Sequence, residues 1–468
     1  LGTAAIPATF GLSWLAFRSL GVAQISAALM ATSPFAVYLA QEARHYTLPI
    51  LWIIASLSCL VIAARAVRDR IPLPVWTSWV WIVVNALGIA THYFFVFTLA
   101  AEAIVIACLG LIQSWRENGR WHPSTHWSRI WMVAGGTFVS GLVWFPVLQN
   151  IQEGELTRWI YQGDRNGFAW LDPIFQAIAG WVSMLYLLPI QSGSETLSTV
   201  CGIGLALLAL WTLPKVVWGL QVQALQRNPR LAVSVLGCFI VSAIALFFSV
   251  TYFFEADLTG AFRYNFVYFP AVIVLVAAAL ASGWNVSQQI AQAPANDVPS
   301  PLLRLLRVCG RKTIVLIGCL SLIGALTVVN NLGYQKIHRP DMVAQAIQQD
   351  LQENVRAESL VAIPYRSHGQ IGRLMGIAWN LTSVQKNPDD SNIHFFLAQD
   401  TQRNSRSAIE NLGKAIRESV KPLHLWLINF HEVEQKPLER MLQLNRCMLE
   451  EKFPSVDGYR YRLYRCRR

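Results

Sequence analysis

Residues 33–66 read SPFAVYLAQEARHYTLPILWIIASLSCLVIAARA, so a polar hexapeptide at 41–46 separates two long apolar runs. Within it, Glu42 and Arg44 would each cost about 2.5–3.5 kcal/mol at the centre of a bilayer. We therefore expect both at the membrane edge, facing water or the protein interior. Two interpretations are open from this pattern alone: a functional site at the membrane boundary, or an interfacial ion pair that ends one helix and starts the next.

The apolar composition assigns the chain to the polytopic α-helical membrane proteins. Of its 468 residues, 54% are hydrophobic and 14% are charged, a balance too apolar for a soluble enzyme of this length. A further segment, 171–189, mixes polar and aromatic residues and fits an amphipathic helix in the membrane interface better than a span. About ten apolar runs approach the ~20 residues that cross a bilayer: 1–18, 21–39, 47–66, 74–91, 95–112, 130–149, 197–219, 231–254, 264–284 and 313–333.

The basic residues of the short loops predict the orientation of these spans. They fall on one side of the membrane, which the positive-inside rule makes cytoplasmic. The other side carries the Glu42 loop, the His92–Tyr93 turn and the loops at 150–196 and 255–263. This parity places Leu1 outside the cytoplasm and already in an apolar run, which predicts at least one more span and an outer loop upstream. The cytoplasmic set is Arg65, Arg68, Arg70, Arg116, Arg120, Arg129, Arg227, Arg230, Arg304, Arg307, Arg311 and Lys312.

After the membrane domain, 1–333, the sequence of 334–468 changes to a small α/β pattern. Its alternation predicts a largely parallel sheet with an antiparallel last strand, outside the cytoplasm by parity. Cys447 and Cys466 either form a disulfide there or remain two free thiols. The expected helices are 341–356, 369–381, 405–419 and 433–450, and the expected strands are Leu360–Ile363, Ile393–Leu397, Leu423–Ile428 and Tyr459–Tyr464.

The formal net charge of +11 does not indicate a nucleic-acid partner. The positive-inside bias of the cytoplasmic loops already explains much of the excess. The remaining cluster lies on the last strand, where we expect one solvated face in contact with anionic lipid headgroups. Its members are Arg460, Arg462, Arg465, Arg467 and Arg468.

Two arginines disobey the orientation rule, since Arg44 and Arg263 sit at the outer ends of spans. A planar guanidinium suits a phosphate through paired hydrogen bonds, and contact with a lipid headgroup is the alternative. Glu42, Glu255 and Asp257 lie at the same level, where carboxylates can hold a divalent cation or act as acid and base. For the last two, a solvated loop is the favoured interpretation.

Glu102 is the one carboxylate inside a predicted span at 95–112. An unpaired carboxylate is expensive there, so Glu102 should be protonated, paired or turned to a polar cavity. His92 and Tyr93, at the outer end of the preceding span, are candidate partners. We expect a structural hydrogen-bonding role for all three.

Three segments of the membrane region together resemble a known family. They are 33–35 with 41–46 (Ser-Pro-Phe, then Gln-Glu-Ala-Arg-His-Tyr), 91–95 (Thr-His-Tyr-Phe-Phe) and 263–264 (Arg-Tyr). This combination resembles the family 39-like glycosyltransferases, related to the protein O-mannosyltransferases and the bacterial aminoarabinose transferases. The resemblance covers about 1–335 and implies the multi-spanning GT-C fold in a bacterial plasma membrane.

The resemblance also implies a reaction. A sugar linked to a polyprenyl phosphate would pass to an acceptor glycan, lipid or protein on the outer face of the membrane, with departure of the lipid phosphate. Glu42 and Arg44 would be catalytic, with Arg44 and Arg263 stabilising the phosphate and Glu42 orienting Arg44 or binding a divalent metal cation. The family's catalytic Asp has no counterpart here, because its loop would precede Leu1. The implied substrate-binding residues are Arg44, His45, Tyr46, His92, Tyr93, Arg263 and Tyr264.

Two other classes of protein fit parts of the same pattern. A transporter or flippase for a lipid-linked or anionic substrate would explain the spans, Glu102 and the outer arginines. A non-catalytic membrane scaffold would use the soluble domain to bind a partner. Sugar transfer from a polyprenyl phosphate donor distinguishes the first interpretation from both others.

Overall fold

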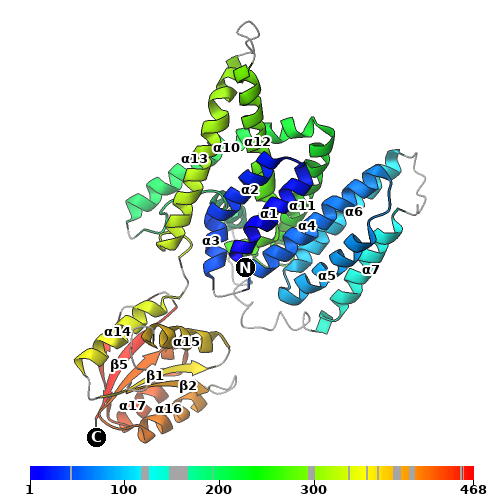
Figure 1. Cartoon of the computed structure of the whole chain (residues 1–468). Helices are drawn as coiled ribbons and strands as arrows, with labels where there is room; N and C mark the ends of the chain where they lie inside the picture. Colours follow the sequence, from blue (N-terminus) through cyan, green and yellow to red (C-terminus); the bar gives the residue numbers. More distant parts are fainter. Residues whose placement is uncertain are drawn as a thin grey trace. The chain divides into compact units, whose positions relative to one another are not determined.

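The computed structural model divides the chain into two compact units, Leu1–Gln335 and Lys336–Arg468 (Figure 1). The first is helical and the second contains a five-stranded sheet. The described residues are 1–42, 45–116, 126–146, 167–192, 194–292, 301–335, 338–354, 357–365, 368–382, 392–399, 406–453, 456 and 458–467.

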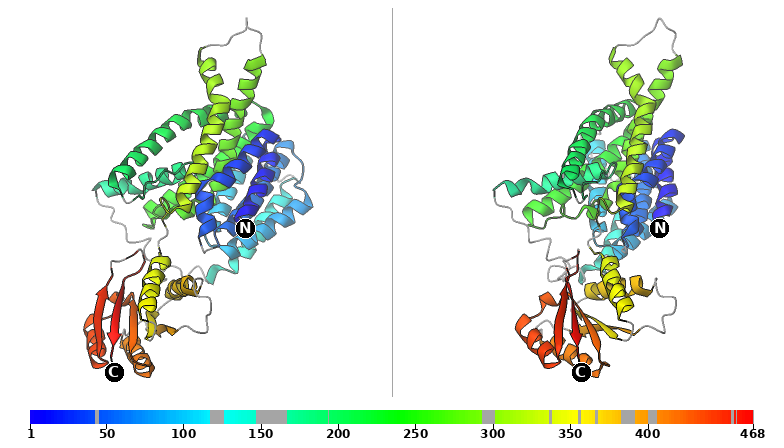
Figure 2. Two further views of the ribbon diagram at one scale, coloured as in Figure 1. Left: turned by 60° about the vertical axis from the view of Figure 1, so that its left-hand side comes forward. Right: turned by 90° about the vertical axis from the view of Figure 1, so that its left-hand side faces the viewer.

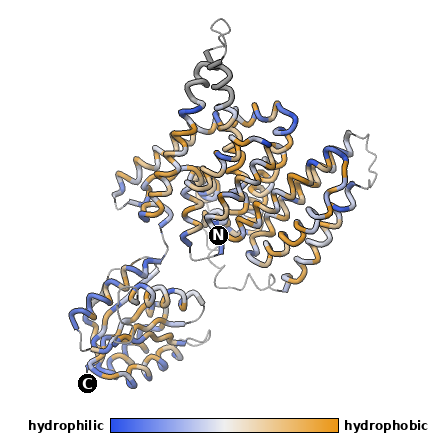
Figure 3. The backbone as a smooth tube through the Cα atoms, in the orientation of Figure 1, coloured by the Kyte–Doolittle hydropathy of each residue, from blue (hydrophilic) through white to orange (hydrophobic). Residues whose placement is uncertain are grey.

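A helix lies in each of the ten predicted spans, which confirms an α-helical membrane domain. Among the described residues, five helices are long and apolar enough to cross a membrane, and the bent pair α2–α3 makes a sixth candidate. Figure 3 shows their apolar character along the bundle. The helices are α1 (Gly2–Phe17), α2 (Leu20–Thr32), α3 (Pro34–Gln41), α4 (Thr47–Asp69), α5 (Val75–Thr91), α6 (Phe95–Arg116), α7 (Ser128–Leu142), α9 (Asp172–Ser183), α10 (Glu195–Ala224), α11 (Arg227–Phe253), α12 (Phe269–Gln292) and α13 (Pro301–Val329), with the short turns η2 (Gly167–Leu171) and η3 (Phe262–Val267).

The predicted span at 21–39 is two helices rather than one, with a bend of 51° between α2 and α3. Pro34 has no N–H for a helical hydrogen bond, and it therefore begins a new helix at its first position. The Ser33 hydroxyl caps this helix by accepting from the Ala36 N–H at 3.2 Å. It also donates to the Met184 carbonyl at 2.7 Å. The start of α3 is thereby held against the end of α9.

Helices α10 and α12 pack with their backbones in close contact. A Cβ atom at Gly219 would lie 2.3 Å from the Ala279 carbonyl oxygen, so only glycine fits this crossing. The Ser282 hydroxyl donates to the Gly219 carbonyl at 3.1 Å across the same contact. Small residues and interhelical hydrogen bonds are the usual means of holding helices together in lipid.

The predicted interfacial segment at 171–189 contains α9, a helix of 12 residues. At 1.5 Å per residue it is too short to cross the bilayer. Its close approach to η3 is visible at Gly180, where an added Cβ would lie 2.5 Å from Asn265 Nδ2. The placement of α9 in the membrane interface stays a prediction.

The C-terminal unit is a three-layer α/β domain with strand order β2-β1-β3-β5-β4. Strand β1 pairs in parallel with β2 and β3, and β5 pairs antiparallel with β3 and β4. The largely parallel sheet with an antiparallel last strand is therefore confirmed. The elements are α14 (Pro340–Glu353), β1 (Glu358–Tyr365), α15 (His368–Thr382), β2 (Ile393–Gln399), α16 (Arg406–Glu418), β3 (Leu423–Ile428), η5 (Phe430–Glu432), α17 (Gln435–Leu444), β4 (Cys447–Lys452) and β5 (Tyr461–Cys466).

Helices cover both faces of this sheet (Figure 2). The face that holds Val361 and Trp426 packs on α14 and α15. The opposite face, with Leu360 and Leu425, packs on α16 and α17. Strand β3 is buried along its whole length, because it lies at the centre of the sheet with a helical layer on each side.

One strand was missed by the sequence analysis, since the helix expected at 433–450 ends at Leu444 and β4 follows. Arg446 takes a left-handed backbone conformation, with φ of 55°, which stops the helix. The acidic sequence of β4 is a poor strand former, and its pairing with β5 supplies the stabilisation. Cys447 pairs in register with Cys466, and the two form a disulfide.

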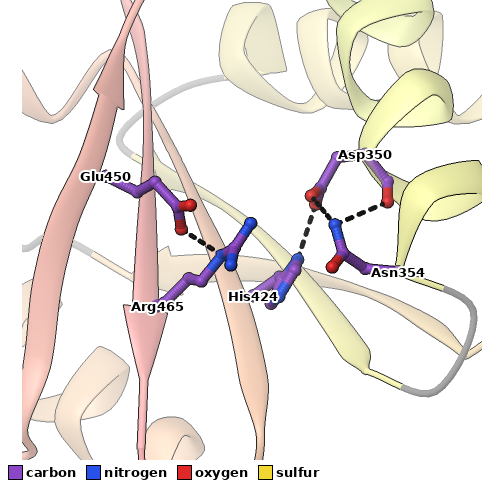
Figure 4. A network of polar contacts seen from close by, with 5 residues as sticks. All are labelled: Asp350, Asn354, His424, Glu450 and Arg465. Carbon is purple, nitrogen blue, oxygen red and sulfur yellow. Dashed lines mark hydrogen bonds and ion pairs between the residues drawn. The ribbon is translucent and has the colours of Figure 1, made fainter.

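Two sets of polar contacts lie near one another in the sheet domain, a buried one at His424 and a partly exposed ion pair (Figure 4). His424 Nδ1 and Asp350 Oδ2 lie 2.7 Å apart, and the Asn354 amide donates to Asp350 Oδ1 at 2.9 Å. On the neighbouring strand, Arg465 forms an ion pair with Glu450. Arg465 therefore does not belong to a freely solvated basic face, as the sequence analysis expected of this cluster.

Candidate functional site

The predicted site residues lie on three loops of the membrane unit. Glu42 caps the C-terminus of α3, and His45 and Tyr46 precede α4. His92 caps the C-terminus of α5, and Tyr93 lies between α5 and α6. Arg44 is outside the described residues, so its place in the site stays a prediction.

The third loop departs from the sequence analysis in local structure. Arg263 and Tyr264 lie in the short 3-10 helix η3, ahead of α12 rather than within a span that starts at 264. All the side chains of η3 from Arg263 to Val267 are buried. This turn directs both side chains inward between the other two loops.

His92 lies where the three loops meet. Its ring centre is 5.1 Å from that of His45, 5.5 Å from that of Tyr46 and 5.1 Å from that of Phe266 in η3. A second contact joins the same loops, because the Phe94 and Tyr264 rings stack at 4.0 Å. Segments more than 200 residues apart in the sequence thus form one aromatic cluster, which we call the loop cluster.

The protonation of His92 follows from its surroundings. Burial, together with the nearby His45 and the positive charge of Arg263, lowers the pKa of His92 to about 3. The ring is therefore neutral at ordinary pH. Its Nδ1 accepts the Phe94 N–H at 3.1 Å, which leaves the proton on Nε2. His92 can donate one hydrogen bond to a ligand without carrying a charge.

Arg263 supplies the positive charge of the loop cluster. It is 9% exposed, and its guanidinium lies close to the phenols of Tyr38 and Tyr264. The guanidinium carbon also lies 5.5 Å from the centre of the Tyr264 ring, at cation–π distance. Burial raises the pKa of Tyr264 above its usual value, so that phenol is neutral. A guanidinium held by neutral phenols keeps its charge for an anionic ligand.

Further residues, which were not predicted from the sequence, surround Arg263. Tyr38 on α3 stacks on Tyr334, with ring centres 4.5 Å apart. Tyr334 in turn hydrogen-bonds with Ser183 at the end of α9. Tyr38 lies one helical turn before Glu42, a spacing that could have identified it. No sequence signal connects Tyr334 with a residue almost 300 positions earlier.

A second set of hydrogen bonds fixes η3 itself. The Trp181 indole donates to the Tyr268 hydroxyl at 2.9 Å, and Tyr268 donates to Asn265 Oδ1 at 2.7 Å. This chain ties α9 to the turn that carries Arg263. The guanidinium is thereby positioned by rigid elements on both sides.

The carboxylates predicted near the site divide into two groups. Glu42 is half-buried on the α3 side of the loop cluster. Asp257 instead stabilises its own loop, because Oδ1 accepts from the Thr259 N–H at 2.9 Å and from the Thr259 hydroxyl at 2.7 Å. This agrees with the loop interpretation for Asp257. Glu255 takes a φ of 55° in the same loop.

Glu102 has a partner other than His92 and Tyr93, the two candidates that the sequence suggested. Glu102 lies two turns inside α6, and its Oε2 accepts from the Trp81 indole of α5 at 3.2 Å. The same indole donates to the Ser56 hydroxyl of α4 at 2.9 Å. His92 is at the C-terminal end of α5, too far along the helix axis from Trp81 to reach this position. Glu102 therefore joins three helices within the bundle, in the structural role expected of it.

The described residues do not fit a resident divalent cation. Among them, no group of three or more His, Cys, Asp and Glu side chains is placed to hold a metal ion. Glu42 is the candidate ligand in the loop cluster. Metal binding at Glu42 stays a prediction.

Comparisons with known proteins give matches among solved structures. Neither the models of protein families nor the curated proteins match the sequence. The crystal structure of ArnT from Cupriavidus metallidurans in the apo state is 13% identical, with a TM-score of 0.49, over 99% of this chain and 82% of that chain. The structure of ArnT from the same organism bound to undecaprenyl phosphate is 13% identical, with a TM-score of 0.45, over 99% of this chain and 83% of that chain.

Proposed function

We propose that this protein is a membrane glycosyltransferase of the GT-C type that uses a polyprenyl-phosphate-linked sugar as donor. The observation that carries the proposal is the convergence of the family-like segments. The loops of Glu42, His92 and Arg263 meet in the loop cluster, where the centre of the His92 ring lies 5.1 Å from the ring centres of His45 and of Phe266. If the resemblance were accidental, segments so far apart in the sequence would have no reason to lie together in the fold.

The loop cluster has the chemistry that a lipid phosphate requires. Arg263 offers a permanent charge with paired N–H donors, and neutral His92 offers a further N–H. In the proposed reaction an acceptor hydroxyl attacks the anomeric carbon, and the bond from that carbon to the phosphate oxygen breaks. The oxygen keeps the electron pair, and the proton of the hydroxyl passes to a base. Arg263 stabilises the charge that develops on the departing phosphate, most effectively in this buried site.

None of the described residues is proposed as the general base. The family resemblance implies an Asp in this role. Glu42 and Arg44 remain the proposed catalytic residues of this chain, with Glu42 orienting Arg44. His45, Tyr46, Tyr93 and Tyr264 would line the sugar and phosphate positions.

We further propose a bacterial plasma membrane as the location, with the C-terminal domain outside the cytoplasm. The distribution of basic residues among the short loops supports this orientation. The disulfide between Cys447 and Cys466 supports it independently, because disulfides persist in oxidising compartments. A cysteine-accessibility experiment on intact cells, with a reporter cysteine at exposed Arg440, tests the topology: labelling by an impermeant maleimide is expected, and labelling only after permeabilisation contradicts it.

The proposed activity is tested with the protein expressed from its natural reading frame and reconstituted in proteoliposomes. The donor carries one label in the sugar and another in the polyprenyl phosphate. A glycosyltransferase releases free polyprenyl phosphate in step with sugar transfer to an acceptor. Movement of the intact donor across the bilayer, with the glycosidic bond preserved, would instead identify a flippase.

A further inference from the structure

The C-terminal domain contains a cavity that the proposed glycosyl transfer does not use. Its volume is about 350 Å³, within the range of pockets that bind small molecules. It opens at the carboxyl end of β3, where the chain passes through η5 into α17 and where the antiparallel strand β5 begins. Ligands of open α/β sheets usually bind beyond the carboxyl ends of the parallel strands.

The floor of this cavity, the β3 pocket, is apolar and its sides are aromatic. Leu427 and Leu438 line it from β3 and α17, together with Phe430 and Tyr464. Phe453 and Tyr461 also line it, with their rings stacked at 5.0 Å and inclined by only 14°. Flat aromatic faces are suited to the C–H bonds on one side of a sugar ring, because the face of the ring carries partial negative charge.

The rim of the β3 pocket is positively charged. Arg460 and Arg462 both line it, and their spacing of two residues places them on the same side of the chain. Within the described part of the chain, neither guanidinium has an ion-pair partner. Arg460 is exposed and Arg462 is half-buried, so both are accessible to a ligand at the mouth of the pocket.

The backbone around the rim is fixed by one buried side chain, Asn429. The backbone N–H of Asn429 donates to the Arg460 carbonyl at 2.7 Å, and its side-chain Oδ1 accepts from the Arg460 backbone N–H at 2.8 Å. Its amide also donates to the Gly458 carbonyl at 3.0 Å. Asn429 itself takes a left-handed conformation, with φ of 58°, directly after β3. The start of β5 is thereby held against the end of β3, and the position of Arg460 is set in advance of binding.

We propose that the β3 pocket binds an anionic saccharide, a sugar that carries a carboxylate or a phosphate. The aromatic sides would pack on the sugar ring, and Arg460 and Arg462 would bind the acidic group through charge-assisted hydrogen bonds. Gln435 lines the pocket from the start of α17. Its Nε2 donates to the Phe430 and Val433 carbonyls, both at 2.8 Å, so its Oε1 would accept from a sugar hydroxyl. The site lies within the soluble domain, and its ligand binding is independent of the proposed transferase activity.

The test measures binding to the full-length protein in detergent by isothermal titration calorimetry. The probes are glucuronate and glucose 6-phosphate, with neutral glucose and inorganic phosphate for comparison. We expect one of the two acidic sugars to bind more tightly than glucose and more tightly than phosphate. The Arg460→Gln/Arg462→Gln variant should bind that acidic sugar with a Kd at least about tenfold higher.

The matched control is Arg417→Gln/Arg440→Gln, which removes the same charge from exposed positions on α16 and α17 and should bind as the wild type does. Arg460→Gln alone, at an exposed position, guards against misfolding and should also weaken binding. Unchanged affinity in the rim variants overturns the proposal. Equal binding of inorganic phosphate and glucose 6-phosphate would also overturn it, since charge alone would then explain the site. Failure of both acidic sugars to bind is a third contrary result.

Discussion

Arg263 is the residue whose replacement should be most informative about the proposed chemistry. It is 9% exposed and contacts the phenols of Tyr38 and Tyr264. In Arg263→Gln the charge is lost, and one amide cannot reproduce the paired N–H donors that a phosphate accepts. Removal of one preorganised donor to a developing anion typically reduces turnover by about 10²–10³, or about 2.7–4 kcal/mol. We expect a loss of this size in kcat.

Arg263→Lys separates charge from geometry. Lysine keeps the positive charge but cannot hold the phenols and bind a phosphate in a bidentate manner. We expect an intermediate loss, about tenfold or about 1.4 kcal/mol. Turnover is measured as release of free polyprenyl phosphate in proteoliposomes, at saturating donor. Arg230→Gln, at an exposed position on α11, is the matched control and should retain the wild-type rate.

The stability of each variant must be measured beside its rate, because Arg263 is buried. Thermal unfolding of the purified protein provides this check. A well-folded Arg263→Gln protein with a rate within about threefold of the wild type would refute the assignment of Arg263 to the phosphate. A rate that falls equally in Arg230→Gln would show a general effect of charge rather than a site.

The remaining predictions concern pH, helix packing and the soluble domain. Burial lowers the pKa of His92 to about 3. Between its usual pKa and pH 3, His92 is therefore protonated in the unfolded chain but not in the folded protein. The free energy of unfolding should decrease by about 1.4 kcal/mol per pH unit as the pH falls through this range. This decline should be shallower in His92→Gln when unfolding is followed between pH 7 and pH 4. In Gly219→Ala the new Cβ would lie 2.3 Å from the Ala279 carbonyl oxygen of α12, so α10 must move away. The free energy of unfolding in detergent should fall by about 1–3 kcal/mol. Gly237 has open space around it, so Gly237→Ala should leave stability unchanged. Asp350→Ala leaves buried His424 without its partner at 2.7 Å, and should cost about 1–3 kcal/mol, seen as faster hydrogen exchange of the β3 amides.

The helical membrane domain and the α/β domain could be predicted because their signals are local. Apolar runs report burial in lipid directly, and β3 was found from its continuous apolar stretch, Leu423–Ile428. The bend at Ser33 was not predicted, although Pro34 marks it, because the run at 21–39 has the length of one span. Strand β4 was also missed, since its pairing with β5 outweighs the weak strand propensity of its own residues.

The candidate site could be predicted only in part, for a physical reason. Motifs on Glu42, His92 and Arg263 were visible in the sequence, but their meeting depends on how helices pack, and packing leaves no short-range pattern. Glu102 illustrates the same point. His92 and Tyr93 were its candidate partners from the sequence, whereas in the structure Glu102 accepts from Trp81 of the neighbouring helix α5.

The central claim is that the loops of Glu42, His92 and Arg263 form one binding site for a lipid phosphate. A photoactivatable polyprenyl phosphate, cross-linked to the reconstituted full-length protein and mapped by mass spectrometry, tests this most directly. The account predicts labelled peptides from all three loops, including residues near Tyr46, Tyr93 and Tyr264, with labelling abolished by unlabelled polyprenyl phosphate and reduced in Arg263→Gln. Labelling confined to other parts of the bundle, unaffected by the competitor and by that substitution, would contradict it.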